Sequence, residues 1–135
     1  MASVQRYLEA VRPAGVVAAY LFGSHARGTA HRESDVDVAV LLDRGRFPER
    51  GGRGREALRL CTELIAATHS NQVDVVLLND VAPEFAAGIV SRGRRLYCTD
   101  VEADRAFVRT ALLRHADIRP FLDRARRVKL RALAR

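Results

Sequence analysis

The sequence predicts an α+β (mixed α/β) fold in which a small mixed sheet is covered by helices. Two observations indicate this class. Short runs of β-branched and aromatic residues alternate along the chain with segments of helical period, a pattern typical of a sheet packed against helices. The chain has 135 residues, 48% of them hydrophobic, which is enough for one domain around a single core.

The first half of the chain predicts one helix and two strands. Apolar residues recur at helical spacing over residues 3–12, and Pro13 and Gly15 end that pattern. Residues 16–22 and 36–42 are rich in β-branched and other apolar side chains, which is typical of buried strands.

The second half continues the alternation and ends in helix. Residues 43–54 are rich in Gly and Arg and predict an exposed, mobile loop. Helical spacing dominates from residue 101 onward, and Pro120 must kink or break it because proline lacks a donor and clashes one turn back. The other expected elements are a helix over residues 55–68, a strand over 73–78, a helix over 83–91 that begins at Pro83, and a strand over 95–98.

The basic charge of the protein is concentrated at its C-terminal end. The net charge is +7, but residues 1–104 sum to −1 and residues 105–135 sum to +8. Residues 1–100 are therefore expected to form the main domain, and residues 101–135 a basic helical extension of it. Such an extension indicates an acidic partner, either nucleic acid or a protein surface, or else a solvated helix face.

The sequence also indicates a cytoplasmic protein without a membrane segment. No apolar run approaches the ~20 residues of a membrane span, and the N-terminus lacks the apolar core of a signal peptide. Cys61 and Cys98 lie far apart in no metal-ligand spacing, so both are expected to be reduced and largely buried thiols. Tyr20 and Tyr97 are expected in the core.

Three aspartates suggest a metal site. Asp35 and Asp37 are two apart in the second strand, so their carboxylates share one face. They repel each other there unless a cation lies between them, and Mg²⁺ prefers such hard oxygen ligands. The alternative is an exposed edge strand. Asp74 opens the third strand, and pairing of that strand with the second would complete the protein half of a two-metal site.

The first strand ends at a possible anion site. Gly23 and Ser24 stop the strand, and a helical turn over residues 25–28 is expected to follow. Free backbone N–H groups and the Ser24 hydroxyl can bind a phosphate, which Gly23 lets approach the backbone. Arg27 could supply a cation. The plain alternative is a turn in which Ser24 caps a helix.

Together these residues resemble one known signature. The stretch Gly23-Ser24-His25-Ala26-Arg27-Gly28, then five residues, then Ser34-Asp35-Val36-Asp37, is similar to the Gly-Ser-x-Ala-Arg-Gly-x5-Ser-Asp-x-Asp motif of the minimal nucleotidyltransferases in the DNA polymerase β superfamily. The resemblance extends over about residues 15–100 and includes the strand that carries Asp74. It implies a polymerase-β-like nucleotidyltransferase sheet with a C-terminal helical extension.

The resemblance also implies roles for these residues. Asp35 and Asp37 would bind two Mg²⁺ ions, and Asp74 would complete the catalytic metal and ready the acceptor hydroxyl. The nucleotide phosphates would be held by Gly23, Ser24 and Arg27.

The family resemblance further suggests the reaction and the partner. Some members are antitoxins that transfer AMP from ATP to a tyrosine of a HEPN-domain toxin, and this activity is expected here. Neutralisation of the partner by contact alone, and transfer to RNA or to a small molecule, remain alternatives.

Five arginines lie in or beside the expected loop over residues 43–54. They are interpreted as solvated charge, with closure over a bound triphosphate as the alternative. These residues are Arg44, Arg46, Arg50, Arg53 and Arg55.

Overall fold

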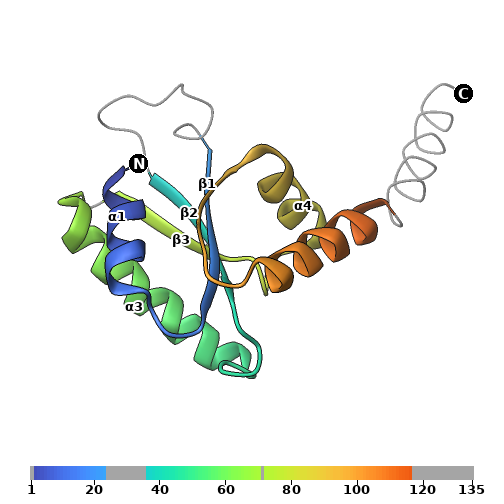
Figure 1. Cartoon of the computed structure of the whole chain (residues 1–135), viewed down its shortest axis with the longest axis horizontal. Helices are drawn as coiled ribbons and strands as arrows, with labels where there is room; N and C mark the ends of the chain where they lie inside the picture. Colours follow the sequence, from blue (N-terminus) through green and yellow to red (C-terminus); the bar gives the residue numbers. More distant parts are fainter. Residues whose placement is uncertain (1, 24–35, 71, 117–135) are drawn as a thin grey trace, which may run out of the picture.

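The structure, a computed structural model, describes residues 2–23, 36–70 and 72–116. In that part of the chain a four-stranded sheet has helices on both faces (Figure 1). The strands are β1 (Val16–Phe22), β2 (Val36–Leu42), β3 (Val73–Leu77) and β4 (Arg94–Cys98). The helices are α1 (Ala2–Val11), α3 (Arg50–Thr68), α4 (Pro83–Arg92) and a helix over residues 101–116.

The sheet is mixed, as predicted, and its strand order is β3-β2-β1-β4. Strand β1 pairs antiparallel with β2 and with β4, whereas β2 and β3 are parallel. Parallel neighbours need a crossover connection, and α3 provides it between β2 and β3. The predicted α+β class, a small mixed sheet covered by helices, is therefore confirmed.

Alternation along the strands gives each face of the sheet its own core. On one face Val38 and Val40 of β2 pack with Leu8 of α1 and with Leu60 and Leu64 of α3. All five side chains are at most 1% exposed, which is the close packing expected of a core.

The opposite face of the sheet is covered by α4 and the helix over residues 101–116 (Figure 1). Tyr20 of β1 and Leu41 of β2 pack there with Ile89 of α4, and Ala111 and Phe107 complete the cluster. The first part of the C-terminal helix thus lies against the sheet.

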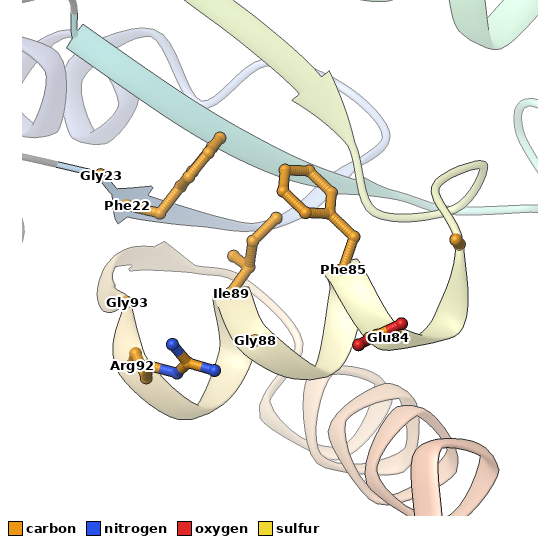
Figure 2. Close-up of a pocket in the computed structure, with 9 residues that line it drawn as sticks. Phe22, Gly23, Glu84, Phe85, Gly88, Ile89, Arg92 and Gly93 are labelled. Carbon is orange, nitrogen blue, oxygen red and sulfur yellow. The ribbon is translucent and has the colours of Figure 1, made fainter. Parts of the chain in front are cut away.

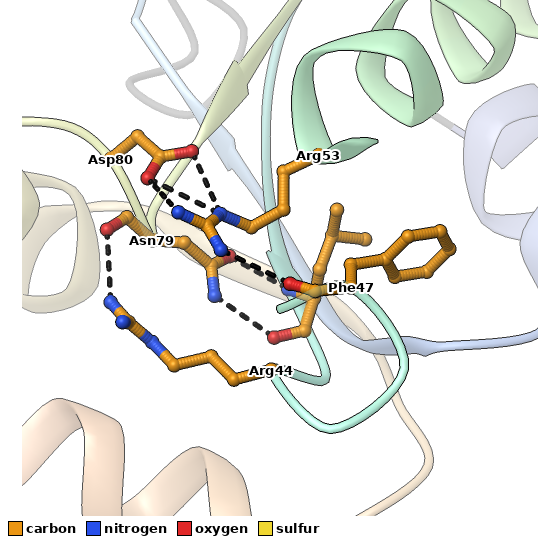
Figure 3. Close-up of polar contacts among 6 residues, drawn as sticks. Arg44, Phe47, Arg53, Asn79 and Asp80 are labelled. Carbon is orange, nitrogen blue, oxygen red and sulfur yellow. Dashed lines mark hydrogen bonds and ion pairs between the residues drawn. The ribbon is translucent and has the colours of Figure 1, made fainter. Parts of the chain in front are cut away.

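The prediction of a loop over residues 43–54 was wrong for the second half of that range, because α3 begins at Arg50. Gly51, Gly52 and Gly54 at the start of α3 disfavour helix, but tertiary contacts override that propensity. The Arg53 side chain is buried and donates to both carboxylate oxygens of Asp80 (Nε–Oδ2 3.1 Å, Nη2–Oδ1 2.9 Å) and to the Phe47 carbonyl (3.0 Å) (Figure 3). These bonds anchor the first turn of the helix.

The side-chain amide of Asn79 binds the backbone at the end of β2 that lies near this helix. Asn79 accepts from the Leu42 N–H and donates to the Leu42 carbonyl, both at 2.9 Å, and Arg44 donates to the Asn79 carbonyl at 3.2 Å (Figure 3). The arginine-rich segment therefore lies at the end of β2 that is opposite Asp37. Seven strand residues span ~20 Å, so closure of this segment over a phosphate at Asp37 is not supported.

The helix predicted over residues 55–68 is α3, which begins five residues earlier, and the helix predicted from residue 101 is described to residue 116. The remaining predicted elements differ from the observed ones by at most one residue at either end. The arginines other than Arg53 are exposed, as the solvated-charge interpretation predicted. Cys61 and Cys98 are free thiols, and both are half-buried rather than largely buried. The expected turn over residues 25–28 and the kink at Pro120 lie outside the described residues. Within the described ranges, no helix combines the length and apolarity needed to cross a membrane.

Candidate functional site

Two of the three predicted carboxylates lie side by side on the sheet. Asp37 is the second residue of β2, and its neighbours Val36 and Val38 face the α1–α3 core, so Asp37 faces the α4 side. Asp74 is the register partner of Asp37 on the parallel strand β3. The neighbours of Asp74, Val73 and Val75, also face the α1–α3 core. The predicted pairing of these strands is confirmed, and it brings Asp37 and Asp74 to one face.

Gly23 lies against the Asp37 carboxylate. It directly follows β1, where Phe22 is the register partner of Asp37. Its φ is +75°, and a Cβ added to it would lie 2.4 Å from Asp37 Oδ2. Glycine is needed at this position for two reasons: other residues disfavour a positive φ, and any side chain would displace the Asp37 carboxylate. The contact of Gly23 with Asp37 was not predicted from the sequence, which indicated a strand end and phosphate binding for this glycine.

The remaining predicted site residues, Ser24, Arg27 and Asp35, lie outside the described residues. Among residues 2–23, 36–70 and 72–116, no group of three or more His, Cys, Asp or Glu side chains is placed to hold a metal. Asp37 and Asp74 nevertheless present carboxylate oxygens on one face, and hard oxygen donors of this kind fit Mg²⁺.

A pocket of about 560 Å³ opens beside Gly23, between the end of β1 and α4 (Figure 2). The Phe22 and Phe85 rings meet edge to face in its wall, with centroids 5.9 Å apart. Phe85 is 48% exposed, which is high for an aromatic side chain. The lining residues are Phe22, Gly23, Ala82, Glu84, Phe85, Gly88, Ile89, Arg92 and Gly93.

Sequence reasoning did not find this pocket, although one signal was available. Val17 and Phe22 of β1 pack toward α4, whereas Leu21 packs toward the other core, so the last strand residue before the Gly-Ser turn faces the carboxylate side. An aromatic residue at that position indicates an apolar wall next to the predicted anion site.

The buried Asp104 carboxylate joins the helix over residues 101–116 to strands β1 and β4 of the sheet. The Tyr20 hydroxyl donates to Asp104 Oδ1 at 2.7 Å, and Arg95 donates to Asp104 Oδ2 at 2.9 Å. Burial, reinforced by the hydrogen bond to Asp104, raises the pKa of Tyr20. Tyr20 is thus a core residue, as predicted, and so is Tyr97. Asp104 was not singled out, because an acid in the first turn of a helix is ordinary.

Comparison with known proteins defines the class. Residues 4–102 match the family model described as Polymerase beta, Nucleotidyltransferase. The match covers well over half of the chain, so the protein belongs to this family, and the predicted nucleotidyltransferase class is confirmed.

The particular relatives narrow the class further. The chain is 32% identical over 91 residues to the protein adenylyltransferase MntA of Shewanella oneidensis, a region that covers 67% of this chain and 60% of that protein. It is also similar to a chain of a toxin–antitoxin crystal structure with AMP-PNP (TM-score 0.65, 26% identity, 92% of this chain and 96% of the other).

A further solved structure shares the fold. It contains a tri-AMPylated Shewanella oneidensis HEPN toxin in complex with an MNT antitoxin, and the match has a TM-score of 0.60 at 20% identity over 92% of this chain and 96% of the other. Together the relatives confirm the predicted resemblance to the minimal nucleotidyltransferase antitoxins.

Proposed function

We propose that this protein transfers AMP from ATP to a tyrosine hydroxyl of a HEPN-domain toxin and so acts as its antitoxin. The proposal is carried by the placement of Asp37 and Asp74, which are register partners on parallel strands and share one face, with Gly23 against the Asp37 carboxylate. The relatives support the choice of reaction, since one is a protein adenylyltransferase and another is a complex with an AMPylated HEPN toxin.

In the proposed reaction the carboxylates bind the metal, and the residues at the end of β1 bind the phosphates. Asp37 and Asp74, together with Asp35, would hold Mg²⁺, which neutralises charge on the attacking and leaving oxygens when bound. Gly23, with Ser24 and Arg27, would bind the phosphates through backbone N–H groups, the hydroxyl and the guanidinium.

The reaction itself exchanges one bond at phosphorus for another. The tyrosine oxygen forms a bond to the α-phosphorus of ATP, the bond from that phosphorus to the bridging oxygen breaks, and pyrophosphate leaves. Asp74 is exposed at the start of β3, so an acceptor can reach it from solvent. There it would accept a hydrogen bond from the tyrosine hydroxyl and then take up its proton. Positioning and electrostatic stabilisation supply most of the rate.

Intact mass spectrometry tests the proposal directly. The HEPN-domain partner is incubated with MgATP and the wild-type protein, and the AMP adducts are counted and mapped. Adducts on a tyrosine are expected, and Asp37→Asn or Asp74→Asn should slow their formation about a hundredfold or more, because loss of one preorganised electrostatic group costs 10²–10³ in rate.

Asp43→Asn provides a matched control. Asp43 directly follows β2 at its other end, where its carboxylate accepts from the Gly45 N–H at 3.0 Å, so this variant should label the partner at the wild-type rate. Full neutralisation of the toxin without any adduct would instead support inhibition by contact. Adducts on RNA, with none on the protein partner, would identify a different acceptor.

A further inference from the structure

The pocket between β1 and α4 has no role in the chemistry described above. We propose that it receives the nucleobase of the nucleotide substrate, with the ring stacked on Phe85. This inference rests on the proposed function, since it concerns the same nucleotide.

The position of the pocket favours the nucleobase over the acceptor. Along the sheet, Asp74 on β3 lies on one side of Asp37, and Phe22 and Gly23 of β1 lie on the other. An acceptor that reaches the phosphorus beside Asp74 therefore approaches from the β3 side. Gly23, to which phosphate binding is assigned, also lines the pocket, so a nucleotide with its phosphates at this residue has its base within reach of the pocket.

The chemistry of the pocket suits a flat aromatic ring. Its volume of about 560 Å³ falls within the range of small-molecule sites, which are mostly apolar with a few polar groups. Phe22, Phe85 and Ile89 supply the apolar walls, and the half-exposed Phe85 ring offers a face for stacking. The polar groups are Glu84 and Arg92, which α4 carries at the rim (Figure 2).

One lining residue allows the pocket to be blocked without disturbing the fold. A Cβ built on Gly88 meets no other atom within 4 Å, although Gly88 lies in the middle of α4 and lines the pocket. A leucine at this position can enter the pocket, and replacing a mid-helix glycine also favours the helix. Gly88→Leu should therefore fill the site while the protein stays folded.

The test compares two ligands by calorimetry in the presence of Mg²⁺, namely ATP and inorganic tripolyphosphate, which lacks the base. Gly88→Leu and Phe85→Ala should each weaken ATP binding about tenfold or more, since base stacking is worth ~1–3 kcal/mol. Binding of tripolyphosphate should not change. Gly54→Leu is the matched control, because Gly54 is a helical glycine of α3 that also has open space around it and lies away from the pocket.

The possible failures are distinguishable. Wild-type protein that binds neither ligand would overturn the proposed function and this inference with it. If the wild type binds ATP and both variants bind it equally well, only the nucleobase assignment is overturned. Equal losses for ATP and tripolyphosphate would also overturn the nucleobase assignment, because the pocket would then contribute to phosphate binding and not to binding of the base. Lowered affinity for the protein partner, with ATP binding intact, would make the pocket a partner contact instead.

Discussion

Gly23→Ala is the substitution that most directly tests how the fold positions the carboxylates. The residue has a φ of +75°, and the new methyl group would lie 2.4 Å from Asp37 Oδ2. The change thus does two things at once: it strains the backbone, and it pushes on a carboxylate assigned to the metal site.

These two effects have different magnitudes. A left-handed backbone costs a non-glycine residue ~1–2 kcal/mol, which lowers the free energy of unfolding by that amount. Restoring ordinary contact distance to the methyl group requires Asp37 Oδ2 to move by about 1 Å. A misplacement of that size in a catalytic group costs about a hundredfold in rate, so activity should fall far more than stability does.

Gly15→Ala separates the two effects. Gly15 has a φ of +83°, and a Cβ there would lie 2.4 Å from Phe47 Cε2, so the backbone strain and the crowding are comparable. Gly15 precedes β1 at the opposite end of the sheet from Gly23, however. Both variants should lose a similar amount of stability in urea denaturation, and only Gly23→Ala should lose adenylylation activity. Equal activity of the two variants would refute the role given to the Gly23–Asp37 contact.

Three further predictions concern stability and partner binding. Tyr20→Phe should lower the free energy of unfolding by about 1–2 kcal/mol, since the buried Asp104 loses a donor. Tyr97→Phe should leave that free energy nearly unchanged, because the buried Tyr97 hydroxyl has no hydrogen-bond partner among the described residues; urea denaturation of both checks this, and equal losses would contradict it. Hydrogen bonds from the Arg53 guanidinium hold the pKa of Asp80 below its usual range. The stability that this ion pair gives to the folded protein is therefore present above about pH 4 and is lost as the pH falls through the lowered pKa. Thermal denaturation across pH should therefore show Asp80→Asn less stable than wild type at pH 7 and equally stable in strong acid; a constant difference would exclude the ion pair as the cause. Deleting residues 120–135 removes a net charge of +5 and should weaken partner binding in low salt more than in high salt, whereas unchanged affinity would indicate a solvated surface.

Much of the fold was predictable because its strands and helices carry strong local patterns. The apolar runs at 16–22 and 36–42 agree with β1 and β2. The position of Asp74 at the head of a strand predicted that it could lie beside Asp35 and Asp37 if the third strand paired with the second, and β3 does pair with β2. The start of α3 was not predictable. It depends on contacts of Arg53 with residues far along the chain, which no local propensity reports.

The site was predicted residue by residue, but its internal contacts were not. The Gly-Ser and Asp-x-Asp spacings indicated which residues belong together, and parity along the second strand predicted that Asp35 and Asp37 share a face. What the spacing could not give is that Gly23 makes room for the Asp37 carboxylate, because this contact depends on antiparallel pairing of β1 with β2. The pocket at Phe85 depends in the same way on how α4 packs.

Contacts at both ends of the β2–β3 pair bear on the register that brings Asp37 and Asp74 together. Like-charged carboxylates on neighbouring strands repel each other. At the end that carries Asp37 and Asp74, the Val36 N–H donates to the Gln72 carbonyl at 2.7 Å. Because side chains alternate, a slip of β3 by one residue would turn Asp74 to the opposite face. At the other end, Asn79 makes two hydrogen bonds to the backbone of Leu42, and the Leu78 N–H donates to the Val40 carbonyl at 2.9 Å. These contacts add to the pairing along β2 and β3, from Val36 with Val73 to Val40 with Leu77, and the resulting register places the two carboxylates opposite each other.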